Sequence, residues 1–275
     1  MKILLIAYDN DSYIHNFPLG LAYIASALRK AGHSVSTYNQ DQFHYPESHL
    51  VDYLTNERFD VVSIGVIGGY YQYRKLLRIS EAIKSVPERP FYILGGHGPS
   101  PEPEYFLKRT GADVIIIGEG ELTVVDLLSA LQNERRLSEV NGIAYVDEGH
   151  LVVTGARELI NDLDSIDLPA WNMFPIDYYS LTRLPHIENH ERSFPVITGR
   201  GCPFRCNFCY RMDQGLRIRS TESVVEEIQI LKTDFGVTYI DFWDELLMSS
   251  PGRIVALSEA FIKAELGIKW FCNGR

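Results

Sequence analysis

The chain is poor in cysteine and has no hydrophobic run long enough to span a membrane. It has four cysteines in 275 residues, three of them within eight positions, which excludes a disulfide framework and favours a reducing compartment. The longest apolar runs, such as 113–118, have the length of a core strand, so the sequence predicts no transmembrane span. The first strand leads into an acidic turn, not a signal-peptide cleavage site. We therefore expect a cytoplasmic protein.

Basic clusters and nucleotide-binding signatures are also absent. The net charge is −10, which argues against a nucleic-acid partner because that binding depends on neutralising phosphates. Neither a Gly-x-Gly-x-x-Gly fingerprint nor a Walker loop occurs, which disfavours a dinucleotide or nucleoside triphosphate. The hydrophobic share of 45% and the charged share of 23% are those of a globular chain. Its length leaves room for two domains.

Residues 1–133 alternate short apolar runs with longer amphipathic ones. Strands are expected at 2–8, 34–39, 60–65, 91–95 and 114–117, and helices at 19–31, 48–56, 71–85, 102–110 and 121–132. This alternation, with near-continuous apolar strands, predicts an α/β domain with a doubly wound parallel sheet of the Rossmann or flavodoxin-like kind.

Three of these strands end in loops rich in small residues. The loop glycines are Gly65, Gly68, Gly69, Gly95, Gly96, Gly118 and Gly120. Ligands of open α/β sheets bind outside the carboxyl ends of the strands, and glycine lets a backbone approach a ligand closely. Taken by themselves, these glycines are explained equally well by tight turns that bind no ligand.

A connector at 134–194 is expected to carry a β-hairpin from the runs 142–146 and 151–154. A second domain then occupies 195–275, with strands at 195–198, 239–243 and 269–273 and helices at 221–233 and 253–264. Strand–helix repeats of this kind predict part of a (βα) barrel, whose active sites lie at the carboxyl ends of the strands.

Cys202, Cys206 and Cys209 follow the first of these barrel strands with the spacing Cys-x-x-x-Cys-x-x-Cys. Three thiolates on a cubane [4Fe–4S] cluster leave one of its irons open for a small molecule. A zinc site is the alternative, but zinc takes four ligands from paired spacings. The nearest further candidates are His186 and His190, on an irregular upstream segment. The spacing therefore favours an iron–sulfur cluster.

This motif resembles the signature of the radical S-adenosylmethionine (SAM) enzymes. The resemblance implies a [4Fe–4S] cluster and SAM as cofactors, with Phe208 beside the adenine. It also implies SAM contacts from Asp244 and Glu245 and, at the next strand end, from Asn273 and Arg275. The alternative for the acidic pair is charge at a helix amino terminus. Cys272 lies within a strand, where a packing role is expected.

The first half is similar to the cobalamin-binding domain of cobalamin-dependent radical SAM enzymes. The resemblance rests on the ordered runs 17–23, 31–35, 95–97 with 103–104, and 118–121. It implies cobalamin contacts from Pro18, Leu19, Gly20, Gly65, Gly68, Gly69, Gly95, Gly96, His97, Gly118, Glu119, Gly120 and Glu121. The Asp-x-His-x-x-Gly motif that supplies a cobalt ligand in other cobalamin proteins is absent. Although His15 and His97 lie on candidate loops, we expect no histidine below the cobalt.

The resemblance implies an enzyme that cleaves SAM reductively to a 5′-deoxyadenosyl radical and transfers a methyl group to an unactivated centre. A small-molecule substrate and an electron donor such as flavodoxin or ferredoxin are the implied partners. Cyclisation or rearrangement with the same cofactors, as in the anaerobic magnesium-protoporphyrin ester cyclase branch, is the first alternative. Because only about three of the family's six barrel units are present, the chain is expected to be truncated at its carboxyl end. A truncated, non-catalytic corrinoid-binding module is thus the second alternative.

Overall fold

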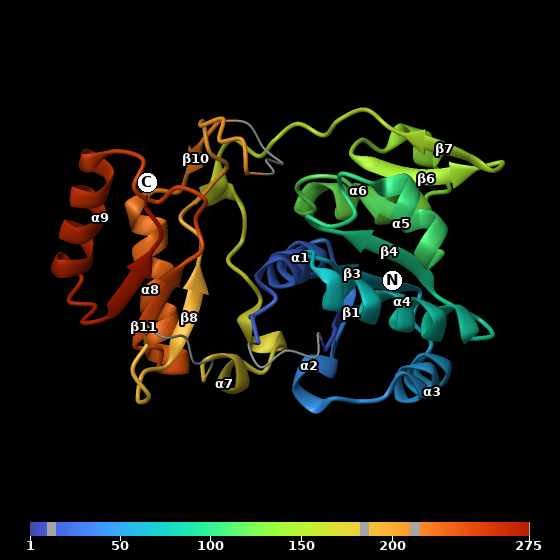
Figure 1. Ribbon diagram of the computed structural model, residues 1–275, viewed down its shortest axis with the longest axis horizontal. Helices are drawn as coiled ribbons and strands as arrows, with labels where there is room; N and C mark the ends of the chain where they lie inside the picture. The colour runs from blue at the N-terminus through green and yellow to red at the C-terminus, as the bar shows by residue number, and fades with distance from the viewer. Residues whose placement is uncertain (10–14, 182–186, 210–214, 275) are drawn as a thin grey trace. The chain divides into compact units, whose positions relative to one another are not determined.

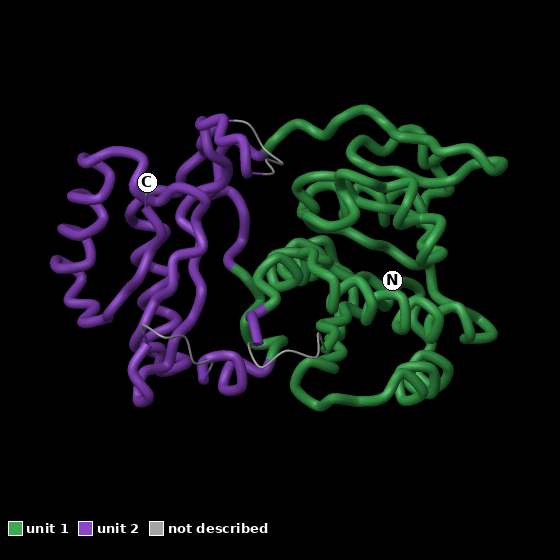
Figure 2. Tube along the Cα trace, in the orientation of Figure 1, with its two compact units in different colours: residues 1–13, 18–159, 169–174 green, residues 14–17, 160–168, 175–275 purple. Residues whose placement is uncertain are grey.

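The structure is a computed structural model that describes residues 1–9, 15–181, 187–209 and 215–274. The chain divides into two compact units (Figure 2). Unit 1 comprises residues 1–13, 18–159 and 169–174, and unit 2 comprises residues 14–17, 160–168 and 175–275. The residues of the expected connector are thus shared between the two units.

A seven-stranded sheet with the order β2-β1-β3-β4-β5-β6-β7 forms the centre of unit 1 (Figure 1). Its strands are β1 (Lys2–Ala7), β2 (Ser34–Asn39), β3 (Val61–Gly65), β4 (Phe91–Gly95), β5 (Val114–Ile116), β6 (Ile143–Asp147) and β7 (His150–Val153). The first five strands are parallel, in the strand order of flavodoxin-like folds. The predicted hairpin forms as β6 and β7, and it extends the sheet antiparallel to β5.

Helices cover both faces of this sheet. They are α1 (Leu19–Lys30), α2 (Gln40–Phe43), α3 (Glu47–Glu57), α4 (Tyr70–Ser85), α5 (Pro103–Thr110) and α6 (Glu121–Gln132). Leu4 and Ile6 of β1 share one core with α3, α4 and α5, whereas Ile3 and Leu5 share the other core with α1 and α6. Successive side chains of a strand point to opposite faces, so a strand apolar throughout requires cover on both sides. The predicted doubly wound sheet is confirmed.

Unit 2 is built on a parallel three-stranded sheet with the order β12-β11-β8. Its main elements are β8 (Ser193–Val196), α8 (Thr221–Phe235), β11 (Tyr239–Phe242), α9 (Pro251–Lys263) and β12 (Lys269–Cys272). Phe242 of β11 stacks on Phe261 of α9, with ring centroids 6.2 Å apart. This is the repeated strand–helix arrangement expected for the first part of a (βα) barrel.

The ends of these two helices follow from local sequence. The Ser220 side chain caps α8 by accepting a hydrogen bond from Ser223 N, and Gly236 ends the helix in a left-handed conformation. Ser250 caps α9 in the same way, followed by Pro251 in the first turn. The start of each helix, and hence the length of each loop before it, is therefore encoded locally.

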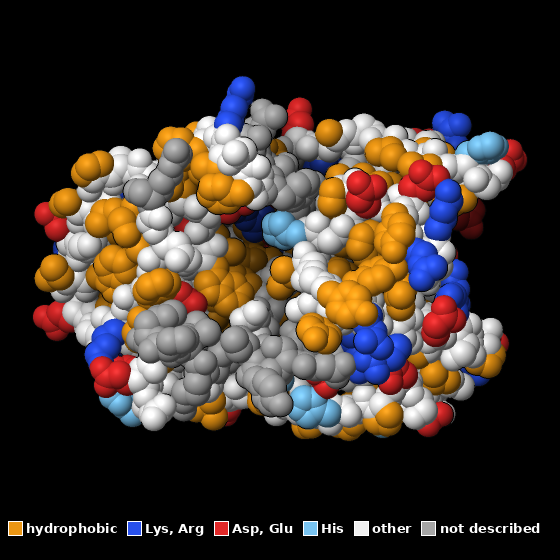
Figure 3. Space-filling model, in the orientation of Figure 1, with side chains coloured by type: hydrophobic (Ala, Val, Ile, Leu, Met, Phe, Trp, Pro, Cys, Tyr) orange, Lys and Arg blue, Asp and Glu red, His pale blue; other side chains and the backbone are white. Residues whose placement is uncertain are grey.

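Short elements complete the chain. These are α7 (Ile176–Tyr179), β9 (Gly199–Arg200), β10 (Arg217–Ile218) and three 3₁₀ turns at 137–139, 163–165 and 171–173. Within the described ranges, every helix is too short or too polar to cross a bilayer. Acidic and basic side chains are interspersed on the face shown in Figure 3, and apolar groups are exposed over the region of α4 and α5.

Candidate functional site

The cysteine loop of unit 2 leaves the carboxyl end of β8 and is closed at its base by a short antiparallel ribbon. Gly199 pairs with Ile218 and Arg200 pairs with Arg217, which joins β9 to β10. A side chain at position 199 would be crowded, because a Cβ there would lie 2.9 Å from the carbonyl oxygen of Arg217. The glycine before the cysteines therefore allows the two ends of the loop to approach each other.

The three loop cysteines present free thiols. Cys202 and Cys206 are half-buried, Cys209 is exposed, and none forms a disulfide. The backbone N–H of Cys209 donates to the carbonyl of Cys206 at 3.4 Å, a weak turn within the motif. Three free thiols on one short loop are a suitable donor set for a [4Fe–4S] cluster with three protein ligands.

Of the two histidines that sequence reasoning offered for zinc, the structure describes His190. His186 lies outside the described residues. His190 precedes β8, whereas the cysteine loop follows that strand, and its ring nitrogens lie 3.5 Å and 3.4 Å from carboxylate oxygens of Glu188 and Glu191. Lys269 Nζ lies 2.8 Å from Glu191, so this cluster already contains its own cation.

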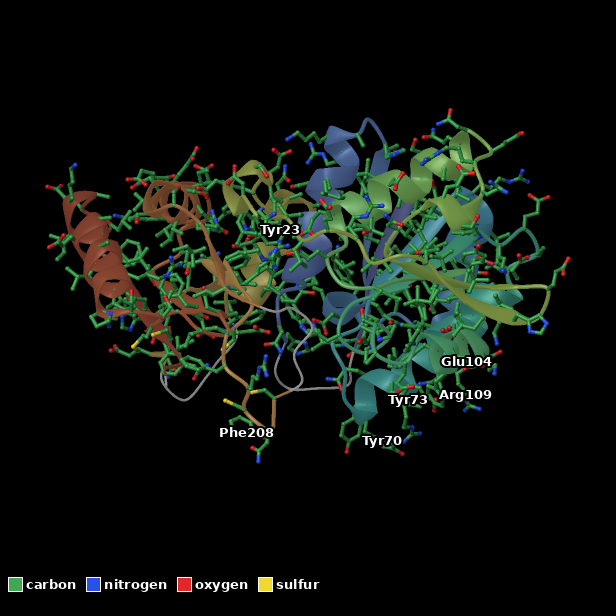
Figure 4. All side chains as sticks on the ribbon, turned by 90° about the horizontal axis from the view of Figure 1, so that it is seen from above. Tyr23, Tyr70, Tyr73, Glu104, Arg109 and Phe208 are labelled. Carbon is green, nitrogen blue, oxygen red and sulfur yellow. The ribbon has the colours of Figure 1, made fainter. Side chains whose placement is uncertain are left out.

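Phe208, the aromatic residue before the last cysteine, is 85% exposed. It lies at the outer end of the loop (Figure 4). An apolar ring in this position is available to pack against a planar ligand such as an adenine.

Asp244 follows β11 and is buried, and its carboxylate holds the residue that begins the cysteine segment. Its Oδ1 and Oδ2 accept hydrogen bonds from the Thr198 N–H at 3.1 Å and 3.0 Å, and Oδ1 also accepts from the Thr198 hydroxyl at 2.7 Å. Arg253 Nη2 of α9 donates to the Thr198 carbonyl at 2.9 Å and to its hydroxyl at 2.6 Å. Burial raises the pKa of the Asp244 carboxyl, and the hydrogen bonds from Thr198 oppose that rise.

The other predicted SAM residues are close to the surface or beyond the described chain. Glu245, next to Asp244, and Asn273, after β12, are both exposed. Arg275 lies outside the described residues. Cys272 is half-buried on β12, and burial raises the pKa of its thiol.

A buried ion pair lies at the other end of the loop, and sequence reasoning did not identify it. Arg219 Nη1 pairs with Glu227 of α8 and also donates to the Ile197 carbonyl at 3.0 Å. Glu227 is fully buried, and burial raises the pKa of its carboxyl despite the opposing effect of Arg219. The signal available in the sequence is a glutamate on the apolar face of α8, together with Val224, Ile228 and Leu231.

In unit 1, the loops after β3, β4 and β5 are hydrogen-bonded into a continuous edge. Val66 N donates to the Gly95 carbonyl at 2.8 Å, and Gly98 N donates to the Val66 carbonyl at 3.0 Å. The Ser100 side chain continues the edge, since its hydroxyl lies 3.4 Å from both the Ile116 carbonyl and Gly118 N. The predicted cobalamin residues of these loops therefore lie on one connected surface.

The glycines of this edge fall into two groups. Gly96 has a φ of +97°, and a Cβ there would lie 2.6 Å from the Val66 carbonyl oxygen, so packing alone requires this glycine. A Cβ at Gly20, Gly68 or Gly118 would meet nothing within 4 Å. Gly68 and Gly118 also have positive φ, +134° and +77°, which by itself favours glycine, whereas Gly20 lies in α1. The open space at these three positions is compatible with the close approach of a ligand.

The remaining predicted cobalamin residues surround this edge. Pro18 and Leu19 lie at the start of α1, His97 is exposed on the loop after β4, and Glu121 begins α6. Gly65 is the last residue of β3, and Gly69, Glu119 and Gly120 complete the set on the loops after β3 and β5. Tyr70, 67% exposed, projects outward at the start of α4 (Figure 4).

An aspartate–histidine pair lies beside the same edge and was not predicted. Oδ2 of Asp9, a buried residue just after β1, lies 2.5 Å from Nδ1 of His44. The two residues are 35 positions apart, so sequence spacing gave no indication of the contact.

Comparisons with known proteins found matches that cover both unit 1 and unit 2. Residues 11–128 match the B12 binding domain family. Over its full length the chain is 30% identical to an uncharacterised methyltransferase of Pyrococcus horikoshii, and it covers 60% of that relative. It is also 30% identical, over 94% of its length, to the anaerobic magnesium-protoporphyrin IX monomethyl ester cyclase of Rubrivivax gelatinosus, of which it covers 46%.

Among solved structures, the chain resembles the cobalamin-dependent SAM radical enzyme OxsB with aqua-cobalamin and SAM bound. The TM-score is 0.81 at 25% identity, over 98% of this chain and 38% of OxsB. The chain therefore spans about half the length of the curated relatives it matches and a smaller share of this structure.

Proposed function

We propose that the chain is a radical SAM enzyme with an amino-terminal cobalamin-binding domain, and that it transfers a methyl group to an unactivated centre of a small molecule. The observation that carries the proposal is the set of three free thiols on the closed loop after β8. The connected glycine edge of unit 1, which lies within the B12 binding match, supports the second cofactor.

The residues divide between the cofactors as follows. Cys202, Cys206 and Cys209 hold the cluster, and Phe208 packs against the adenine of SAM. Glu245 and Asn273, both exposed at strand ends, contact the polar groups of SAM together with Arg275. When bound, the cluster supplies the electron that cleaves SAM, and cobalamin supplies a carrier for the methyl group.

Cobalamin binds over the carboxyl edge of the unit 1 sheet, where open space lies above Gly20, Gly68 and Gly118. The protein's part in this chemistry is to hold each cofactor in a fixed orientation and to exclude side reactions. A one-electron carrier such as flavodoxin or ferredoxin is the proposed source of the reducing electron.

Cyclisation with the same cofactors is the second candidate, favoured by the relative from Rubrivivax gelatinosus. That cyclase has the same identity to the chain as the methyltransferase relative, 30%, over 94% of the chain instead of its full length. The residues that would distinguish the two reactions are those that bind the substrate.

The first test is anaerobic reconstitution with iron, sulfide and hydroxocobalamin, followed by reduction in the presence of methyl-labelled SAM. We expect about four irons and one corrinoid per chain, release of 5′-deoxyadenosine, and label in a methylated product when candidate substrates are supplied. 5′-Deoxyadenosine with an unlabelled, rearranged product would favour the cyclase candidate instead. Bound corrinoid without SAM cleavage would identify a non-catalytic corrinoid-binding module.

A further inference from the structure

Thr198 connects several elements of unit 2 although it carries no predicted function. It lies between β8 and β9 and is fully buried. Its N–H and hydroxyl donate to Asp244 after β11, and its carbonyl accepts from Arg253 of α9. The same carbonyl accepts from the backbone N–H of Arg219, just after β10, at 2.9 Å. Both ends of the cysteine loop therefore meet at this one residue.

Charged side chains stabilise both residues of this contact, Thr198 and Arg219. Asp244 and Arg253 act directly on Thr198, while Arg219 is held by Glu227 and by Ser223, whose hydroxyl lies 2.9 Å from Arg219 Nη2. Thr198, Asp244, Arg219 and Glu227 are each at most 7% exposed. Hydrogen bonds to buried charged groups are among the stronger ones, and losing one partner leaves the other unsatisfied.

We propose that Thr198, Asp244, Arg253, Arg219 and Glu227 form a loop clamp, a positioning assembly that fixes both ends of the cysteine loop and thereby the geometry in which its thiolates hold the cluster. The inference rests on the proposed function. It gives Asp244 a role different from contact with SAM, because its carboxylate is engaged by Thr198. Supporting residues of this kind orient the ligands of a metal site and adjust its properties.

The test compares variants of the full chain after anaerobic reconstitution, all studied without SAM. Thr198→Val removes the hydroxyl, Asp244→Asn removes the charge, and Glu227→Gln weakens the support of Arg219. Thr198→Ser is the conservative rescue. Glu226→Gln is the matched control, because Glu226 neighbours Glu227 on α8 but is exposed.

We expect the first three variants to release iron to a chelator about 10 to 100 times faster than the unaltered chain. Their reduced clusters should also give altered EPR spectra, while Thr198→Ser and Glu226→Gln keep the original rate and spectrum. An Asp244 that contacted only SAM would leave the SAM-free cluster unchanged in Asp244→Asn. Unchanged iron release and spectra in Asp244→Asn and Thr198→Val would overturn the proposal.

Amide hydrogen exchange on the cluster-free chain separates this inference from the proposed function. The amides at 198–200 and 217–219 should exchange faster in Thr198→Val and Asp244→Asn, with exchange in unit 1 unchanged. A chain that binds no cluster would contradict the proposed function, whereas unchanged exchange at these amides would overturn the clamp itself. Should Thr198→Val fail to fold, Asp244→Asn, which keeps the shape of the side chain, decides the result.

Discussion

At the scale of single residues, the four cysteines differ in their surroundings. Three lie on a loop with Gly201 and Pro203, outside the strands of the two sheets of unit 2. The fourth, Cys272, is part of β12, and burial raises the pKa of its thiol, which disfavours the thiolate that binds metal. Sequence spacing alone separates the two groups, because ligand spacing is a local property.

Serine substitution tests this separation. Cys202→Ser, Cys206→Ser or Cys209→Ser should each lower the iron content of the reconstituted chain well below the expected number of about four, because one of three protein ligands is lost. Cys272→Ser is the matched control and should keep the full iron content. Iron counting and visible absorption measure both. Full iron content in the three loop variants would contradict the assignment of these ligands.

For Asp244, the partner found in the structure differs from the one that the sequence predicted. Its place after a strand, beside Glu245, predicted a contact with SAM. In the structure its oxygens accept three hydrogen bonds from Thr198, a residue 46 positions earlier. No local pattern reveals such a partner, because the contact exists only once β8 and β11 pair.

At the scale of elements, α1 of unit 1 and α9 of unit 2 begin alike. Each has a glycine as its second residue, Gly20 and Gly252, and a Cβ at either position would meet nothing within 4 Å. Alanine suits a helix better than glycine does. For Gly20, which we propose to contact cobalamin, the space above the backbone would allow a ligand to approach closely.

Alanine substitutions at these two positions distinguish an effect on folding stability from an effect on cobalamin binding. Gly20→Ala and Gly252→Ala should each raise the free energy of unfolding by about 0.5 kcal/mol. Gly20→Ala alone should weaken cobalamin binding, by about tenfold or more, because its methyl group occupies the space of the ligand. Denaturant unfolding and a cobalamin absorbance titration measure the two effects. Equal cobalamin affinity in both variants would remove Gly20 from the proposed site.

At the scale of the whole molecule, ion pairs join segments that are distant in sequence. In unit 1, Asp126 of α6 lies 2.5 Å from both Arg135, after the helix, and Arg157, after β7. Desolvation raises the pKa of Asp126, but hydrogen bonds from Arg157 and Arg135 outweigh it and hold the pKa below its ordinary value. The segment that follows the β6–β7 hairpin is thereby joined to α6 by an ion pair.

The lowered pKa gives this pair a defined pH dependence. The ionised carboxylate stabilises the folded chain above the unfolded pKa of about 3.9, and this contribution is lost as the pH falls through the lower, folded pKa. Asp126→Asn should therefore cost about 1 kcal/mol near pH 6 and progressively less below about pH 4. Denaturant unfolding across this range is the measurement, with Asp52→Asn, an exposed residue of α3, as the control. A cost of Asp126→Asn that stayed constant with pH would refute the argument.

The sequence by itself determined the strand–helix alternation, the doubly wound sheet, the caps of α8 and α9, and the cysteine motif. Each of these depends on residues near one another in the chain, where periodicity, capping and ligand spacing act. Only the tertiary structure decided that the hairpin joins the sheet and that Gly96 is required by packing. It also decided that Thr198 links Asp244, Arg253 and Arg219. These features depend on contacts between distant segments, which form when buried polar groups find their partners in the folded chain.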